Sequence, residues 1–84
     1  MSFNFGKVLK QYRMERGFTQ WKLGKEAGLS PSYILRLERA ERFPSYETVE
    51  RLALALRLGR EEKRRFFRSA GYLAPEDLEE EVLS

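Results

Sequence analysis

The chain has 84 residues, with 16 lysines and arginines against 13 aspartates and glutamates and with neither cysteine nor histidine. This length suits one domain with a single core, and the missing residue types exclude disulfides, thiol nucleophiles and the usual zinc ligands. No apolar run approaches the roughly 18 residues of a membrane span, and the N-terminus lacks a hydrophobic signal segment. We therefore expect a soluble, cytoplasmic protein with no metal, cofactor or membrane partner.

Hydrophobic periodicity predicts short helices along the whole chain. The predicted helices span 4–16, 20–27, 31–39, 46–57 and 61–69, and a final turn or helix spans 76–83. Each has apolar residues at i, i+3 or i+4 spacing, so one face of every helix can enter a common core. The sequence therefore predicts an all-α fold, a compact bundle of about five short helices with a short C-terminal helical extension.

Residues 20–39 carry the signals of two helices joined by a tight turn. Thr19 and Ser30 are suited to cap the two helix starts, and Gly28 can supply the left-handed residue that ends the first helix. Gly24 lies inside the first helix, where glycine costs about 1 kcal/mol relative to alanine. We expect close approach of the second helix to compensate for Gly24.

Many further residues occur at the spacing of a known family. They are Leu9, Arg13, Gly17, Phe18, Thr19, Gln20, Leu23, Gly24, Gly28, Leu29, Ser30, Ile34, Leu37, Glu38, Pro44, Ser45, Leu52, Ala53, Ala55 and Leu56. With this pattern the segment 5–58 resembles the phage repressor and Cro-like helix-turn-helix proteins, also called the XRE family. The resemblance implies a lambda repressor-like bundle that binds operator DNA, usually as a dimer. It also implies a salt bridge between Arg13 and Glu38 that joins the first helix to the recognition helix 31–39.

Three positions depart from the family pattern. Lys22 stands where an acidic residue usually completes a capping box with Thr19, and a lysine there opposes the helix dipole unless a phosphate lies nearby. Ala40 stands where glycine commonly follows the recognition helix, which disfavours a left-handed turn. Pro31 replaces a residue that can donate to DNA in relatives, so that position is expected to be silent.

The outward face of helix 31–39 is the expected DNA-reading surface. Because Ile34 and Leu37 face the core, Arg36 lies on the opposite arc. Arg36 is the leading base reader, since an arginine can bond guanine O6 and N7 as a pair; the alternative is a solvated arginine paired with a glutamate. The candidate DNA-binding residues are Gln20, Lys22, Ser30, Ser32, Tyr33, Arg36, Arg39 and Arg42.

Several of these residues have two readings. The resemblance implies that Gln20 contacts the phosphate backbone. The basic residues Lys22, Arg39 and Arg42 either contact phosphates or form a solvated basic face. Tyr33 contacts a thymine methyl or a phosphate, or it packs on Leu37. Trp21 lies at the phosphate edge or, as we favour, forms a hydrophobic lid.

The C-terminal end is acidic, since five of the 13 acidic residues follow Pro75. These are Glu76, Asp77, Glu79, Glu80 and Glu81. We assign 1–72 to a helix-turn-helix DNA-binding domain and 73–84 to an acidic C-terminal extension that serves dimerisation, binds a protein partner or is a solvated helix face.

The apolar set Phe66, Phe67, Tyr72, Leu73, Leu78 and Val82 forms part of a dimer seam or closes the core of the monomer.

Together these features predict a sequence-specific regulator of transcription that binds double-stranded DNA, namely a repressor that binds an inverted-repeat operator as a homodimer. We expect no enzyme and no catalytic residue, because the serines lack a histidine base and neighbouring carboxylates diverge around their helices. The alternative is a protein-interaction module, such as an antitoxin or adaptor, that uses the same helical bundle.

Overall fold

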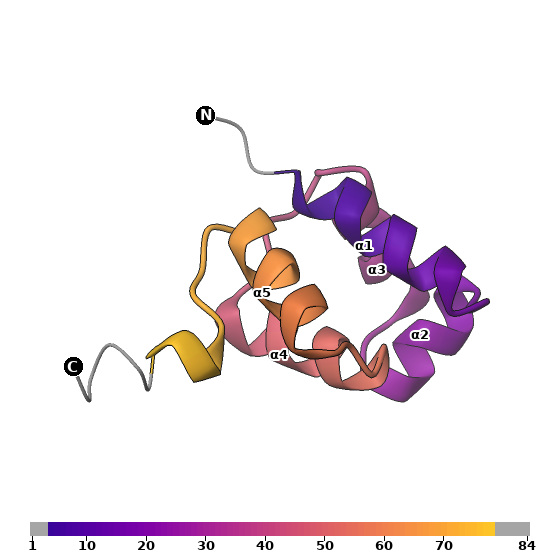
Figure 1. Ribbon diagram of the computed structural model, residues 1–84. Helices are drawn as coiled ribbons and strands as arrows, with labels where there is room; N and C mark the ends of the chain where they lie inside the picture. Colours follow the sequence, from indigo (N-terminus) through magenta and orange to yellow (C-terminus); the bar gives the residue numbers. More distant parts are fainter. Residues whose placement is uncertain (1–3, 79–84) are drawn as a thin grey trace.

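The computed structural model describes residues 4–78 and shows a helical bundle (Figure 1). Its helices are α1 (Phe5–Glu15), α2 (Gln20–Ala27), α3 (Pro31–Glu38), α4 (Tyr46–Ala55) and α5 (Arg60–Ser69). Residues 75–78 form a further helical turn, and the described part of the chain contains no strand. The predicted all-α fold is confirmed.

The helix starts lie within one residue of their predicted positions because most of them are fixed by local caps. Thr19 Oγ1 accepts the backbone N–H of Lys22 at 3.0 Å, and Ser30 Oγ accepts that of Tyr33 at 3.1 Å. Ser45 caps α4 in the same way. Each such cap satisfies an N–H that has no partner inside its helix and is worth about 1 kcal/mol.

The core is built mainly from the apolar stripes of the five helices. Phe66 and Phe67 on α5 are both fully buried. The ring of Phe66 lies 4.9 Å from that of Phe5 and 6.0 Å from that of Tyr12, measured between centroids, so α5 is packed against α1. Phe66 and Phe67 therefore close the core of the monomer, which is the second of the two alternatives given for them above.

Two glycines allow backbone segments to approach closely. A Cβ on Gly24 would lie 2.4 Å from the carbonyl oxygen of Leu29 and 3.4 Å from the nitrogen of Pro31, so the turn after α2 and the first residue of α3 both approach this glycine closely. A Cβ on Gly6 would lie 2.6 Å from the carbonyl oxygen of Glu38 and 2.7 Å from that of Leu37. Gly6 therefore lets α1 contact the C-terminal end of α3, which the sequence analysis did not anticipate.

Left-handed residues end α2 and follow α3. Gly28 has φ 72°, as predicted. Ala40 has φ 61°, so the turn that we expected an alanine to disfavour is present. The left-handed region costs a residue with a Cβ about 1 kcal/mol or more.

Arg16 connects the end of α1 to the turn between α4 and α5. Its Nε donates to the carbonyl oxygen of Leu56 at 2.8 Å, and its Nη2 lies 3.0 Å from Glu62 Oε1. The same carboxylate accepts the N–H of Gly59 at 2.9 Å. These donors, first the Gly59 N–H and then Arg16, lower the pKa of Glu62 below its ordinary value.

The described part of the C-terminal extension is packed on the bundle. Ala74 is fully buried. Glu76 Oε1 lies 2.9 Å from Lys63 Nζ, and Asp77 Oδ2 lies 3.3 Å from Arg64 Nε. The predicted boundary between 72 and 73 therefore does not coincide with a loss of packing in this range. The remaining acidic residues Glu79, Glu80 and Glu81 and the apolar Val82 lie outside the described residues.

No helix among residues 4–78 is long and apolar enough to cross a membrane. In the same range, no cluster of three or more potential metal-ligating side chains occurs.

Candidate nucleic-acid interface

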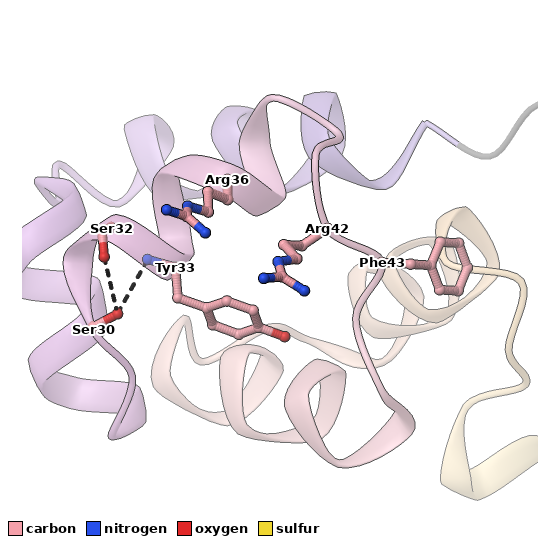
Figure 2. A pocket seen from close by; sticks show the side chains of 6 residues that line it. All are labelled: Ser30, Ser32, Tyr33, Arg36, Arg42 and Phe43. Carbon is pink, nitrogen blue, oxygen red and sulfur yellow. Dashed lines mark hydrogen bonds between the residues drawn. The ribbon is translucent and has the colours of Figure 1, made fainter.

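The exposed side of α3 and the loop that follows it form a shallow groove (Figure 2). The groove has a volume of about 460 Å³ and is lined by Ser30, Ser32, Tyr33, Arg36, Arg42 and Phe43. Figure 2 shows the side chains of Tyr33, Arg36 and Arg42 on the same side of the ribbon, with the two serines at the start of α3. Five of the eight predicted DNA-binding residues are thus brought together.

The helical periodicity of α3 explains which side chains reach this groove. Ile34 and Leu37 are buried in the core, and Ser32 and Arg36 on the opposite arc are exposed. Tyr33 lies between the arcs, where its half-buried ring packs against the core cluster. Tyr33 thus combines packing against the core with a place in the lining of the groove.

The groove is electropositive. Within the part of the chain that the structure describes, none of Arg36, Arg39 and Arg42 forms an ion pair with a carboxylate, and all three are exposed. The first turns of α2 and α3 contain no acidic residue, whereas those of α4 and α5 do. Since the N-terminus of a helix carries a partial positive charge, these two starts add to the positive potential of this side.

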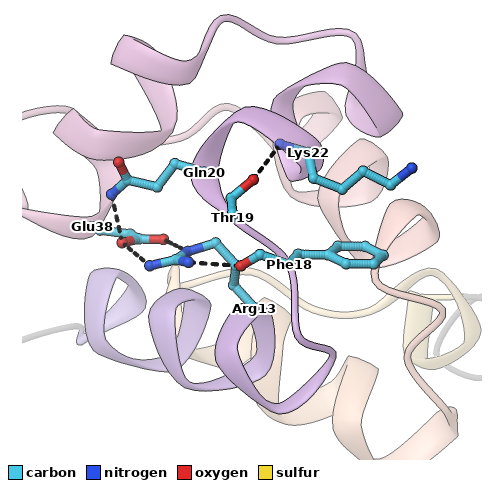
Figure 3. Close-up of polar contacts among 6 residues, drawn as sticks. All are labelled: Arg13, Phe18, Thr19, Gln20, Lys22 and Glu38. Atoms are coloured by element: carbon cyan, nitrogen blue, oxygen red, sulfur yellow. Dashed lines mark hydrogen bonds and ion pairs between the residues drawn. The ribbon is translucent and has the colours of Figure 1, made fainter.

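Glu38, the last residue of α3, is the centre of a polar network that fixes the orientation of this helix (Figure 3). Arg13 forms a two-point contact with it, Nε to Oε2 at 2.6 Å and Nη2 to Oε1 at 3.1 Å. Arg13 Nη1 also donates to the carbonyl oxygen of Phe18 at 2.8 Å. The side chains of Arg13 and Glu38 are only 12% and 4% exposed, so this implied ion pair is present and largely buried.

Gln20 joins the same network. Its Nε2 donates to Glu38 Oε1 at 3.1 Å, which ties the start of α2 to the end of α3. The resemblance implied a phosphate contact for this side chain, and one of its two amide protons is used inside the protein instead. The second amide proton and the backbone N–H of Gln20 are the groups with which a phosphate contact would be made.

Lys22 does not belong to the groove. Its Nζ pairs with Glu26 Oε1 at 3.1 Å, and it lines a separate hollow with Arg16, Phe18 and Arg57. Figure 3 shows the side chains of Gln20 and Lys22 pointing in opposite directions from α2. Lys22 and Glu26 are one turn apart on the exposed side of α2, so the lysine has a carboxylate partner within its own helix.

Two other residues differ from expectation. Arg39 is exposed at the C-cap of α3 but does not line the groove. Phe43 does line it and is 62% exposed, with its ring 6.4 Å from that of Tyr72. Phe43 was not among the predicted site residues, and its signal in the sequence is an aromatic residue between an arginine and a proline, outside any helical stripe.

Comparison with known proteins agrees with this geometry. Residues 4–66 match the model of a helix-turn-helix domain family. The fold matches the crystal structure of the restriction-modification controller protein C.AhdI from Aeromonas hydrophila with a TM-score of 0.67 and 33% sequence identity, over 73% of this chain and 92% of that one. A comparison with curated protein sequences found no match.

The chain belongs to the Cro/XRE-like helix-turn-helix family of DNA-binding proteins. Its function is accordingly that of a DNA-binding regulator of transcription.

Proposed function

We propose that the protein is a repressor that binds an inverted-repeat operator as a homodimer in the cytoplasm, and that it acts by binding rather than by catalysis. The observation that carries this proposal is the groove in front of α3. It presents the exposed Arg36 on a helix whose opposite face is buried and whose end is fixed by the Arg13–Glu38 ion pair. A major groove admits one such helix, and bound protein would exclude the polymerase from an overlapping promoter.

We assign different roles to the side chains of this face. Arg36 reads a guanine through O6 and N7, and Ser32 and Tyr33 contact neighbouring bases or phosphates. Ser30, Arg39 and Arg42 hold the backbone of the DNA, together with Gln20. Lys22 is left out of this set because it pairs with Glu26 in a different hollow.

The proposed homodimer uses an apolar face of α4. Leu54 is 81% exposed, the highest value among the exposed large hydrophobic residues. It borders a hollow of about 200 Å³ together with Glu50, Ala53, Lys63, Phe67 and Pro75. We assign this face to a second copy of the chain, because an inverted-repeat operator requires two copies and an exposed apolar side chain beside a hollow suits an apolar partner. A partner at the acidic end is not proposed, since Glu76 and Asp77 are paired with α5.

Selection of bound sites from a random pool of DNA duplexes tests the operator. We expect two half-sites in inverted orientation, with centres about one helical turn apart or a multiple of it. A single, asymmetric half-site would contradict the homodimer, and a pool without enrichment would contradict sequence-specific binding.

Sedimentation equilibrium tests the dimer face. We expect the unmodified chain to be a dimer and Leu54→Glu to be a monomer, because a carboxylate on an apolar interface loses its hydration. Met14→Glu is the matched control: Met14 is also a largely exposed apolar residue on a helix, α1, and does not line the hollow. A dimer that persists in Leu54→Glu would place the interface elsewhere.

A further inference from the structure

Trp21 and Lys25 form an exposed pair on the outer surface of α2. Trp21 is the single tryptophan of the chain and is 60% exposed. Lys25 Nζ lies 5.2 Å from the centre of its ring, within the range of a cation–π interaction. Our expectation that Trp21 is a hydrophobic lid is therefore wrong. Trp21 is not among the described hydrophobic residues that form the core or pack against it, and Lys25 is the neighbour over its ring.

The contacts of α2 show which side of the helix carries this pair. Gln20 reaches Glu38 of α3, and Gly24 packs against Leu29 in the turn that leads to α3. Successive residues of an α-helix are rotated by 100° about its axis, so Trp21 lies beside Gln20 on the helix surface and Lys25 lies beside Gly24. Trp21 and Lys25 therefore lie on the exposed edge of α2 that adjoins its contacts with α3.

The other exposed edge of α2 faces a different part of the molecule. Lys22 and Glu26 are rotated by about a further 100° around the helix axis from Trp21 and Lys25. They line the hollow that includes Arg16, Phe18, Ala55, Leu56 and Arg57. The two lysines of α2 thus differ in surroundings: Lys22 is paired with a carboxylate next to the end of α4, and Lys25 lies over an indole beside the recognition face.

Resting on the proposed function, we infer that Trp21 and Lys25 bind a phosphate of the DNA strand that borders the groove read by α3. The indole Nε1–H is a donor without an acceptor function, and the ammonium supplies the positive charge, so the pair suits an anion. The contact carries no base specificity and sets the position of α3 across the major groove. It is additional to the contacts that we assign to Gln20, Arg39 and Arg42.

The fluorescence of Trp21 reports this contact directly, because no other tryptophan contributes. The probe is a mixed-sequence DNA duplex, long enough for two half-sites, at low salt, followed by a duplex from the selected pool. We expect the duplex to shield Trp21 from acrylamide quenching, whereas the free protein is quenched strongly. Unchanged quenching in the presence of bound DNA would overturn the inference and leave DNA binding itself intact.

The two lysines provide matched variants. We expect Lys25→Gln to reduce the slope of log affinity against log salt by about 1, the effect of one phosphate contact, and Lys22→Gln to leave the slope unchanged. Equal slopes for the two variants would overturn the assignment of the two edges. Both side chains are exposed, so neither variant is expected to unfold, and circular dichroism checks this.

Trp21→Phe distinguishes the contribution of the indole N–H from that of the aromatic ring, because phenylalanine keeps a ring and lacks the donor. We expect it to weaken binding of every duplex by about tenfold, because a donor to a charged acceptor is lost, and to leave the sequence preference unchanged. Full affinity in Trp21→Phe would overturn the phosphate contact and would indicate that the indole serves another partner, such as a protein surface. Failure of the unmodified chain to bind any duplex at low salt is a different result and contradicts the proposed function instead.

Discussion

The two halves of the bundle use their cations differently. On α5, Lys63 and Arg64 are paired with Glu76 and Asp77 of the C-terminal turn. On α3 and the loop after it, Arg36 and Arg42 form no ion pair with any described carboxylate and lie in one groove. A net charge of +3 does not reveal this division. Lys63 and Arg64 hold the C-terminal turn on the bundle, whereas Arg36 and Arg42 are available to a ligand.

The largest expected effect on stability comes from breaking the largely buried network around Glu38. Glu38→Ala leaves the largely buried Arg13 with only the carbonyl of Phe18 as a partner among the contacts described above. Stranding a charge in this way costs about 3–5 kcal/mol. We expect a loss of this size in the free energy of unfolding, measured with urea, and weaker DNA binding because α3 loses its orientation.

Glu47→Ala is the control for that experiment. Glu47 pairs with Arg51 at 3.1 Å on the surface of α4, where both side chains are mostly exposed. Exposed pairs contribute about 0–1 kcal/mol. Similar losses in the two variants would show that burial does not distinguish the two ion pairs.

The next effect separates two arginines within the groove. Arg36→Ala is expected to cost about 1–3 kcal/mol of binding free energy at one base position and to relax the preference there. Arg42→Ala is expected to weaken binding to all sequences alike, because a phosphate contact carries no base information. Competition binding with single-base variants of the selected site measures both. Uniform losses in both variants would contradict the division into base reader and backbone contact.

Acid should lower the free energy of unfolding through two carboxylates that do not line the groove, those of Glu62 and Glu76. A carboxylate with a lowered pKa stabilises the fold above its ordinary pKa near 4.5, and this contribution is lost as the pH falls through the lowered value. Glu62 and Glu76 both have lowered pKa values, Glu62 through Gly59 and Arg16 and Glu76 through Lys63. Unfolding free energies should therefore decline below about pH 5.

Glu62→Gln tests the origin of that decline. Because Glu62 is partly exposed, we expect the variant to lose only about 1 kcal/mol at neutral pH and to show a shallower decline in acid. Urea unfolding across the acidic range measures both quantities. A decline identical to that of the unmodified chain would assign the acid sensitivity to other carboxylates.

The smallest effect has the opposite sign. Ala40 has φ 61°, a conformation that glycine adopts without the penalty of a Cβ. We expect Ala40→Gly to raise the free energy of unfolding by about 0.5–1 kcal/mol, net of the greater entropy of glycine in the unfolded chain. Thermal unfolding measures it. A lower melting temperature would show that the turn after α3 is not strained by the alanine.

The sequence was a good guide to the helices because their signals are local. Thr19, Ser30 and Ser45 cap the helices that they precede, and Gly28 ends α2 in the left-handed conformation. These features depend on residues three or four positions apart. The burial of one arc of α3 likewise follows from spacing alone, so its exposed arc was correctly located.

Apart from the partners of Lys22 and Trp21, which lie four positions away, the unpredicted contacts join residues that are distant in the chain. Nothing near Lys22 or Trp21 indicates which side of α2 faces α3, because that depends on how the two helices cross. The close approach of Gly6 to the end of α3 and the link from Arg16 to Glu62 likewise join residues more than 30 positions apart. The choice between the two alternatives for Phe66 and Phe67 likewise depends on distant residues, because the rings of Phe5, Tyr12 and Tyr46 pack against them.

The contact at Gly6 has a consequence for binding thermodynamics. Since α1 touches the end of α3 backbone to backbone and the largely buried Arg13–Glu38 pair holds the same end, the tilt of α3 is fixed before a ligand binds. A surface preorganised in this way loses little conformational entropy on association. The heat-capacity change on operator binding should therefore reflect the dehydration of the two surfaces and lack the large additional term of coupled folding.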